Sequence, residues 1–123
     1  METIFAYTRQ NAIDDGVLVN VSEMAKQAGF KYPVAITERL HNAIENIPEV
    51  YSHEDYNGRL WDILNMCRLY EGRSNNEGTI LFQVILHTEN NLQKSDLPIT
   101  LKAICHPGDN MAPVVTLMFP TED

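Results

Sequence analysis

Apolar residues in the first half of the chain recur at helical spacing, in segments separated by residues that end helices. Short helices are predicted over residues 9–14 and 23–28, and Gly29 supplies the left-handed residue that stops the second one. Between them, residues 17–21 are rich in β-branched Val, which predicts a short strand. This part of the chain is therefore expected to consist of short elements joined by tight turns.

Two longer helices are predicted next, with different apolar faces. Residues 36–47 form an amphipathic pattern that Thr37 would cap and Pro48 would end. The apolar positions of this pattern are Ile36, Leu40, Ala43, Ile44 and Ile47. Residues 59–71 are apolar on nearly every side, which is typical of a helix that is mostly buried. We expect this helix to be the centre of the core, with Trp61 as its largest anchor.

The second half of the chain changes to strand-like patterns. Strands are predicted over residues 79–87, 98–105 and 114–119, separated by polar or turn-forming links at residues 90–96 and 107–110. Links this short favour antiparallel neighbours, because a parallel crossover needs about a dozen residues or more.

The order of these elements predicts the fold class. It is an α+β fold, in which about three N-terminal helices and a short strand pack on a C-terminal, mainly antiparallel sheet of three to four strands. No internal repeat and no linker rich in Ser, Gly or Pro divides the sequence. We therefore expect a single domain over residues 1–123.

The charge balance narrows the range of partners. Nine Lys and Arg stand against seventeen Asp and Glu in 123 residues, for a net charge of −8. Nucleic acids and anionic lipids need a basic face, so neither is expected as a direct partner. A protein with a basic surface remains a candidate partner, and the acidic residues concentrate in one stretch. The candidate docking residues there are Glu45, Glu49, His53, Glu54 and Asp55.

The cysteines and the N-terminus bear on localisation. Cys67 and Cys105 are too few for a disulfide scaffold and are predicted to be small buried residues. The first residues lack the basic leader and apolar stretch of a secretion signal, and no apolar run is long enough to span a membrane. A cytoplasmic protein is expected.

Metal and catalytic motifs are weak. Glu38, His41 and Glu45 lie on one side of a predicted helix, like half of a di-iron site. No second Glu-x-x-His motif exists, and this side is opposite the apolar stripe, so we expect no metal and no cofactor. The motifs typical of nucleotide-dependent enzymes, serine hydrolases and metalloproteases are also absent from the sequence. No catalytic residue is assigned, and an enzyme is the less favoured class.

Two further groups of residues are candidates for binding. Arg59, Asp62, His87 and His106 could line a pocket between helices and sheet, and Arg59 and Asp62 are spaced to pair on one helix. The connector segment Phe30, Lys31 and Tyr32 carries two aromatic residues outside regular elements. Aromatic residues in such positions are enriched at interfaces, so this segment is expected to touch a partner or to seal a pocket.

Several motifs resemble those of a family of small uncharacterised proteins carried on bacterial plasmids, phages and conjugative elements. They are DGVLVNVSE at 15–23, AGFKYPVA at 28–35, GRLWD at 58–62 with Met66, and LKAICHPGD at 101–109 leading to PVVT at 113–116. The resemblance covers nearly the whole chain. It implies an accessory role in maintenance, in transfer or in interference with a host defence, and assigns no activity.

The leading hypothesis is therefore a non-catalytic accessory protein that binds another protein, with a homodimer as a further option. The alternative is a small enzyme or ligand-binding domain whose pocket lies between helices and sheet.

Overall fold

The computed structural model describes residues 7–70, 78–89 and 97–122 and has an α+β fold. Within these residues the helices are α1 (Arg9–Asp14), α2 (Ser22–Ala28), α3 (Glu38–Glu45) and α4 (Tyr56–Leu69), and a 3-10 turn, η1, spans Glu49–Tyr51. The strands are β1 (Leu18–Asn20), β2 (Val34–Thr37), β3 (Thr79–Val84), β4 (Ile99–Pro107) and β5 (Pro113–Met118). The N-terminal segment 1–6 and the predicted link at 90–96 lie outside the described residues.

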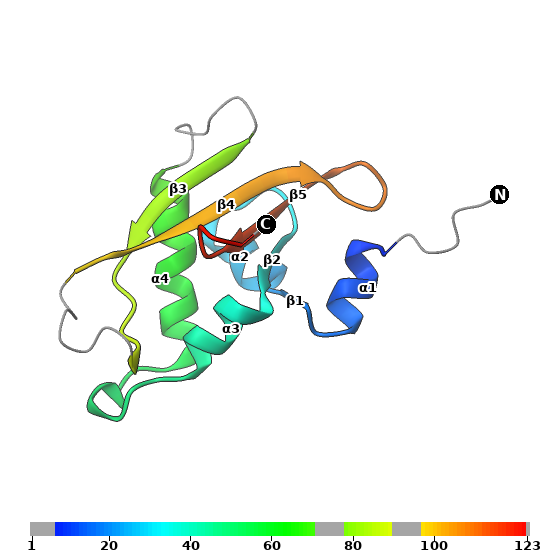
Figure 1. The fold of residues 1–123 in the computed structure, drawn as a ribbon. Helices are drawn as coiled ribbons and strands as arrows, with labels where there is room; N and C mark the ends of the chain where they lie inside the picture. Colours follow the sequence, from blue (N-terminus) through cyan, green and yellow to red (C-terminus); the bar gives the residue numbers. More distant parts are fainter. Residues whose placement is uncertain (1–6, 71–77, 90–96, 123) are drawn as a thin grey trace.

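All five strands form one mixed sheet in the order β1-β2-β5-β4-β3 (Figure 1). β3, β4 and β5 form the antiparallel meander that their short links predict. β1 pairs with β2 in antiparallel orientation, whereas β2 and β5 run parallel. The expectation of helices followed by a separate sheet of three to four strands is therefore wrong in part. Two strands from the N-terminal half complete the sheet.

The strand that the sequence pattern missed is β2. Pro33 and Ile36 predict a break and the start of a helix, but residues 34–36 form a strand segment that is buried on both faces. A short apolar run has the same appearance in a buried strand and in a buried helix, so periodicity does not distinguish them. The third helix consequently begins later than expected, at Glu38.

Two helix ends follow the local signals in the sequence. Thr37 caps α3 as predicted, because its Oγ1 accepts a hydrogen bond from the Leu40 N–H at 3.2 Å. Gly29 ends α2 with a φ of 104°, which L-residues rarely adopt. A side chain at Gly29 would also overlap the guanidinium of Arg68. The backbone angle therefore favours glycine there, and any side chain would also force the Arg68 guanidinium to move.

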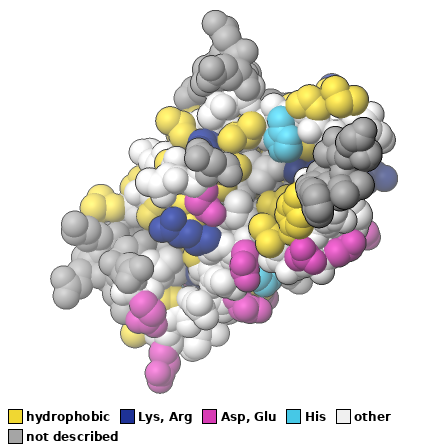
Figure 2. All heavy atoms as spheres, turned by 45° about the vertical axis from the view of Figure 1, so that its right-hand side comes forward, with side chains coloured by type: hydrophobic (Ala, Val, Ile, Leu, Met, Phe, Trp, Pro, Cys, Tyr) yellow, Lys and Arg dark blue, Asp and Glu magenta, His cyan; other side chains and the backbone are white. Residues whose placement is uncertain are grey.

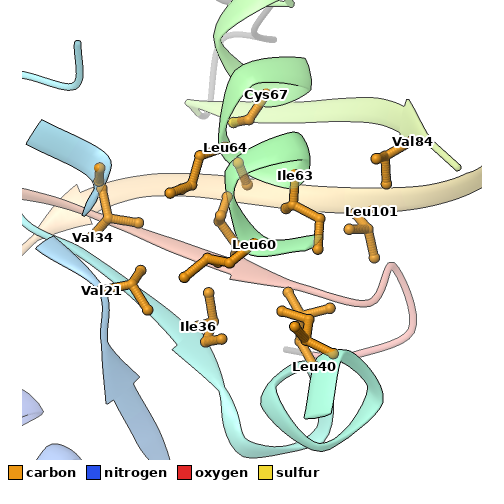
Figure 3. Close-up of a cluster of buried hydrophobic side chains, with 14 of the residues drawn as sticks. Val21, Val34, Ile36, Leu40, Leu60, Ile63, Leu64, Cys67, Val84 and Leu101 are labelled. Atoms are coloured by element: carbon orange, nitrogen blue, oxygen red, sulfur yellow. The ribbon is translucent and has the colours of Figure 1, made fainter. Parts of the chain in front are cut away.

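The main core lies between the sheet and the layer formed by α2, α3 and α4. α4 contacts β3 and both other helices, and Figure 3 shows its apolar side chains meeting those of the strands. α1 lies against β1 at the opposite end of the molecule from α4 (Figure 1). The buried cluster comprises Val21, Ala25, Val34, Ile36, Leu40, Ile44, Leu60, Ile63, Leu64, Cys67, Phe82, Val84, Leu86, Leu101, Ala103, Val115 and Leu117.

α4 is central, but it is less buried than its composition suggests. Its core side is covered, whereas Trp61 is 39% exposed and Leu69 is 71% exposed. Trp61 is therefore not the core anchor that the sequence predicts. Cys67 is buried as expected, but Cys105 is exposed, which corrects the second cysteine prediction. In both cases the neighbouring layer covers only part of the element, and an apolar pattern does not show how far that cover extends.

Within the described ranges, no helix is both long and apolar enough to cross a membrane.

Candidate functional site

Arg59, in the first turns of α4, is almost fully buried, with 5% of its side chain exposed. Its guanidinium makes four hydrogen bonds. Three go to backbone carbonyls: Nε donates to Ile44 at 3.0 Å, and Nη2 donates to Ala43 at 3.1 Å and to His87 at 2.9 Å. The fourth, from Nη1, goes to Glu54 Oε1 at 2.8 Å. Arg59 therefore ties the end of α3 and the segment after β3 to α4.

The Glu54 carboxylate connects Arg59 to His87. Its second oxygen lies 3.0 Å from His87 Nδ1, and because an ionised carboxylate only accepts hydrogen bonds, Nδ1 must carry the proton. The His87 ring also stacks on Tyr51 of η1, with ring centroids 3.7 Å apart and planes 5° from parallel. We call these four residues the Glu54 cluster: Tyr51, Glu54, Arg59 and His87.

The cluster lowers the pKa of Glu54. Partial burial alone would raise the pKa of this carboxyl group, but hydrogen bonds and charges from Arg59 and His87 outweigh that effect. The net result is a pKa below the ordinary value of 4.5. Arg59 and His87 therefore hold the carboxylate in its charged form. Both are fixed by other contacts, Arg59 to backbone carbonyls and His87 to the Tyr51 ring.

The pKa shift predicts how stability depends on pH. A carboxyl group whose pKa is lower in the folded state contributes stability that is complete above its ordinary pKa of 4.5. That contribution is lost as the pH falls from 4.5 through the lower folded pKa. Urea unfolding at several pH values should therefore show a difference between wild type and Glu54→Gln that is largest near neutral pH and shrinks in acid. A difference that stays constant down to pH 3 would show that the carboxylate charge is not what the cluster stabilises.

Of the five candidate docking residues, the structure leaves four at the surface. Glu45, Glu49, His53 and Asp55 are exposed, whereas Glu54 turns inward to the cluster. Asp55 also caps α4, because its Oδ1 accepts from the Gly58 N–H at 2.7 Å. A cap of this kind contributes about 1 kcal/mol, so Asp55 has a structural role whatever it binds.

Among the residues considered for a metal site, His41 contacts Tyr56 and lies near Glu45. His41 Nδ1 lies 2.7 Å from the Tyr56 hydroxyl, and its Nε2 is 3.9 Å from Glu45. Burial raises the pKa of Tyr56, and the charge of Glu45 adds to the shift. In the part of the chain that the structure describes, no group of three or more His, Cys, Asp or Glu could hold a metal ion.

Three of the four pocket candidates, Arg59, Asp62 and His87, line one hollow, whereas His106 lies elsewhere. Arg59 and His87 meet through Glu54, and the ion-pair partner of Arg59 is Glu54 rather than Asp62. Asp62 is exposed on α4.

His106 is held elsewhere in the fold. Its Nε2 lies 2.9 Å from the Thr116 hydroxyl, which also accepts a hydrogen bond from Arg9 at 2.7 Å. Asp109 fixes the start of α1 nearby by accepting from the Arg9 and Gln10 N–H groups. His106 therefore belongs to the contact between α1 and the β4–β5 hairpin.

Sequence reasoning missed Tyr51 and the linking role of Glu54. The available signal was the position of Arg59 among apolar residues in a helix predicted to be mostly buried. A buried guanidinium needs an acidic partner and acceptors, but which carboxylate supplies them depends on how residues 49–55 fold back.

Two shallow hollows beside the Glu54 cluster share Asp62 and Ile85, and we call them together the α4–β3 groove. One, of about 350 Å³, is lined by Glu54, Arg59 and His87 of the cluster, and also by His53, Asp55 and Trp61. The other, of about 440 Å³, runs between α4 and β3, with Met66 and Gln83 among its residues. Trp61 and Ile85, which is 52% exposed, give the groove an apolar surface next to a carboxylate.

A third hollow, of about 260 Å³, brings together the connector residues singled out from the sequence. Phe30, Lys31 and Tyr32 line it, opposite residues of α4 and the sheet that include Cys67 and Cys105. The connector therefore borders a pocket between helices and sheet, separate from the α4–β3 groove.

Acidic side chains do not form one continuous surface on the face shown in Figure 2. They stand in separate groups with Lys and Arg side chains among them. On this face the described acidic side chains are therefore spread rather than gathered in one patch.

Comparison with known proteins places the chain in a family. No curated protein and no solved structure matches it significantly. The whole chain, residues 1–123, matches a family of unknown function, DUF6573. This match includes all the motifs and the site described above. The protein therefore belongs to the DUF6573 family.

Proposed function

We propose that the protein is a non-catalytic accessory protein that binds a basic segment of another protein at the α4–β3 groove. The observation that carries the proposal is the exposure of Trp61 and Ile85 beside the carboxylate of Asp62. Exposed Trp side chains bordered by polar residues are common centres of binding energy at protein interfaces.

The charges around the groove favour a basic partner. The carboxylates of Asp55 and Asp62 line it at the surface, while Arg59, the one Arg or Lys among its described lining residues, is already bonded to Glu54 and backbone carbonyls. A basic segment would therefore meet the Asp55 and Asp62 carboxylates, which no described Lys or Arg of the groove neutralises. The net charge of −8 would also speed the association of the two proteins.

The biological setting of the proposal comes from the sequence. The resemblance to proteins of plasmids, phages and conjugative elements supports a protein of the bacterial host as the partner. Interference with a host defence system, in the cytoplasm, is the process we propose.

A charge-reversal experiment tests the proposal. Immobilised wild type should retain a specific partner from bacterial lysate at low and moderate salt, and Asp62→Lys or Trp61→Ala should weaken its binding at least tenfold. Asp14→Lys is the matched control, because Asp14 is an exposed acid on α1, at the opposite end of the molecule from the groove (Figure 1). Equal retention by wild type and Asp62→Lys, or no specific partner at either salt concentration, would contradict the proposal.

Ligand binding is the second candidate, and the pocket beside the connector favours it. Its lining includes apolar Ile80, Ala103 and Val115 and the two cationic residues Lys31 and Arg68. Native mass spectrometry of protein purified from bacteria distinguishes the two functions. A bound small molecule that Ala103→Leu excludes would favour the ligand-binding function.

A further inference from the structure

The edge strand β3 has backbone groups that face away from the rest of the sheet. In its antiparallel register with β4, the Gly78 carbonyl accepts from the Cys105 N–H at 3.0 Å, and such pairs recur at every second residue along β3. The N–H and C=O groups of Leu81 and Gln83 therefore point away from β4. Among the described residues these groups have no hydrogen-bond partner. We call them the open edge of β3.

The open edge lacks the features by which proteins usually prevent strand addition. β3 contains no charged residue and no Pro, and its register with β4 is one-to-one over six residues, so no bulge interrupts it. The Leu81 side chain beside the open edge is 57% exposed. The edge at the other side of the sheet differs, because β1 has only three residues and α1 lies against it.

The described surface beside the open edge carries one carboxylate and no Lys or Arg. The carboxylate is that of Asp62, which borders the part of the α4–β3 groove next to β3. We propose that an extended basic segment of another protein adds to the open edge of β3 as a further strand. The inference rests on the proposed function and deepens it, because it states how the partner binds and which chemistry it carries.

The two faces of such a strand would meet different side chains. Alternate residues would lie over the groove, near Asp62 and Met66, and the others would lie beside Leu81 on the outer face of the sheet. The segment that fits therefore alternates Lys or Arg with aliphatic residues. The main-chain bonds to Leu81 and Gln83 supply affinity, and the alternation supplies specificity.

Charge also argues against a second copy of this chain as the occupant. Pairing two β3 strands edge to edge would place two acidic grooves side by side, on two molecules that each carry −8. Like charges brought together at an interface oppose association. A basic segment gains from the same charges that a second copy would have to overcome.

The test uses the full chain and a fluorescein-labelled peptide of about eight residues in which Lys alternates with Val. We expect this peptide to bind and a Glu–Val peptide not to bind. Two further peptides, N-methylated either at every Val or at every Lys amide, test the mode of binding. Only one side of an added strand faces β3, so one methylated peptide should lose binding and the other should keep it.

A variant tests the same edge from the protein side. Leu81→Pro removes an N–H that points away from β4, so the sheet keeps its own hydrogen bonds while the added strand loses a donor. Binding should weaken about tenfold, the value of one such bond. Leu81→Thr, which keeps the N–H, is the control. Because the methylated peptides use the wild-type protein, the test holds even where Leu81→Pro does not fold.

Three outcomes would overturn the inference. If both methylated peptides bind as well as the unmethylated one, strand addition is wrong. The proposed function would still stand in that case if Asp62→Lys weakens binding of the lysate partner. If no peptide binds but the lysate partner is retained, the basic extended segment is wrong and the groove function survives. A dimer in wild type that Leu81→Pro abolishes would identify a second copy as the occupant.

Discussion

Replacing Arg59 by Met is expected to lower the free energy of unfolding by about 3–5 kcal/mol, the cost of removing one partner from a buried ion pair. The change removes four hydrogen bonds at once. It leaves the carbonyls of Ala43, Ile44 and His87 without their donor, and the Glu54 carboxylate without its cation. Urea denaturation followed by circular dichroism measures the loss directly.

Two other substitutions show whether the cost comes from burial. Arg39→Met removes a guanidinium that is exposed and lies 4.9 Å from the Phe119 ring centroid, so we expect a loss of about 1 kcal/mol or less. Arg59→Lys keeps the charge but cannot reproduce the planar set of donors, so it should restore only part of the stability. A loss at Arg59 no larger than at Arg39 would mean that the Glu54 cluster does not hold the fold together.

The elements that were predicted correctly depend on neighbouring residues. Gly29 and Thr37 act within one turn of a helix, and the meander of β3, β4 and β5 follows from short links and alternating apolar positions. Such signals are local, so they are present in the sequence whatever the remainder of the chain does.

The elements that were missed depend on contacts between distant residues. β2 is a strand because β5, eighty or so residues further on, pairs with it in parallel, and the pairing of Val34 with Val115 leaves no local trace. Trp61 is partly exposed for a similar reason. The apolar pattern of α4 does not show that the sheet and the other helices cover only one of its sides.

The candidate site shows the same division. Arg59, Asp62 and His87 could be selected as individual residues, because charged and imidazole groups near apolar patterns are few. The link between Arg59 and His87 could not be predicted. Glu54 joins the two residues, and it lies thirty-three residues before His87 in the sequence. The open edge of β3 was also hidden, because a strand at the edge of a sheet and one inside it have similar patterns. Only the strand order distinguishes them.

Replacing Phe82 by Ala is expected to lower the free energy of unfolding by about 3–5 kcal/mol, whereas Leu81→Ala should change it by about 0.5 kcal/mol or less. The two residues are neighbours on β3, but Phe82 is fully buried under α4 and Leu81 is 57% exposed. Thermal or urea unfolding of the two variants measures both values under one condition.

The comparison also tests whether the outer face of β3 is accessible. A large apolar side chain that contributes little to stability is available for a partner, which is what strand addition at Leu81 requires. A loss at Leu81 as large as that at Phe82 would mean that other parts of the chain cover this face. The open edge would then be part of the folded core, and the binding surface would have to lie along α4 alone.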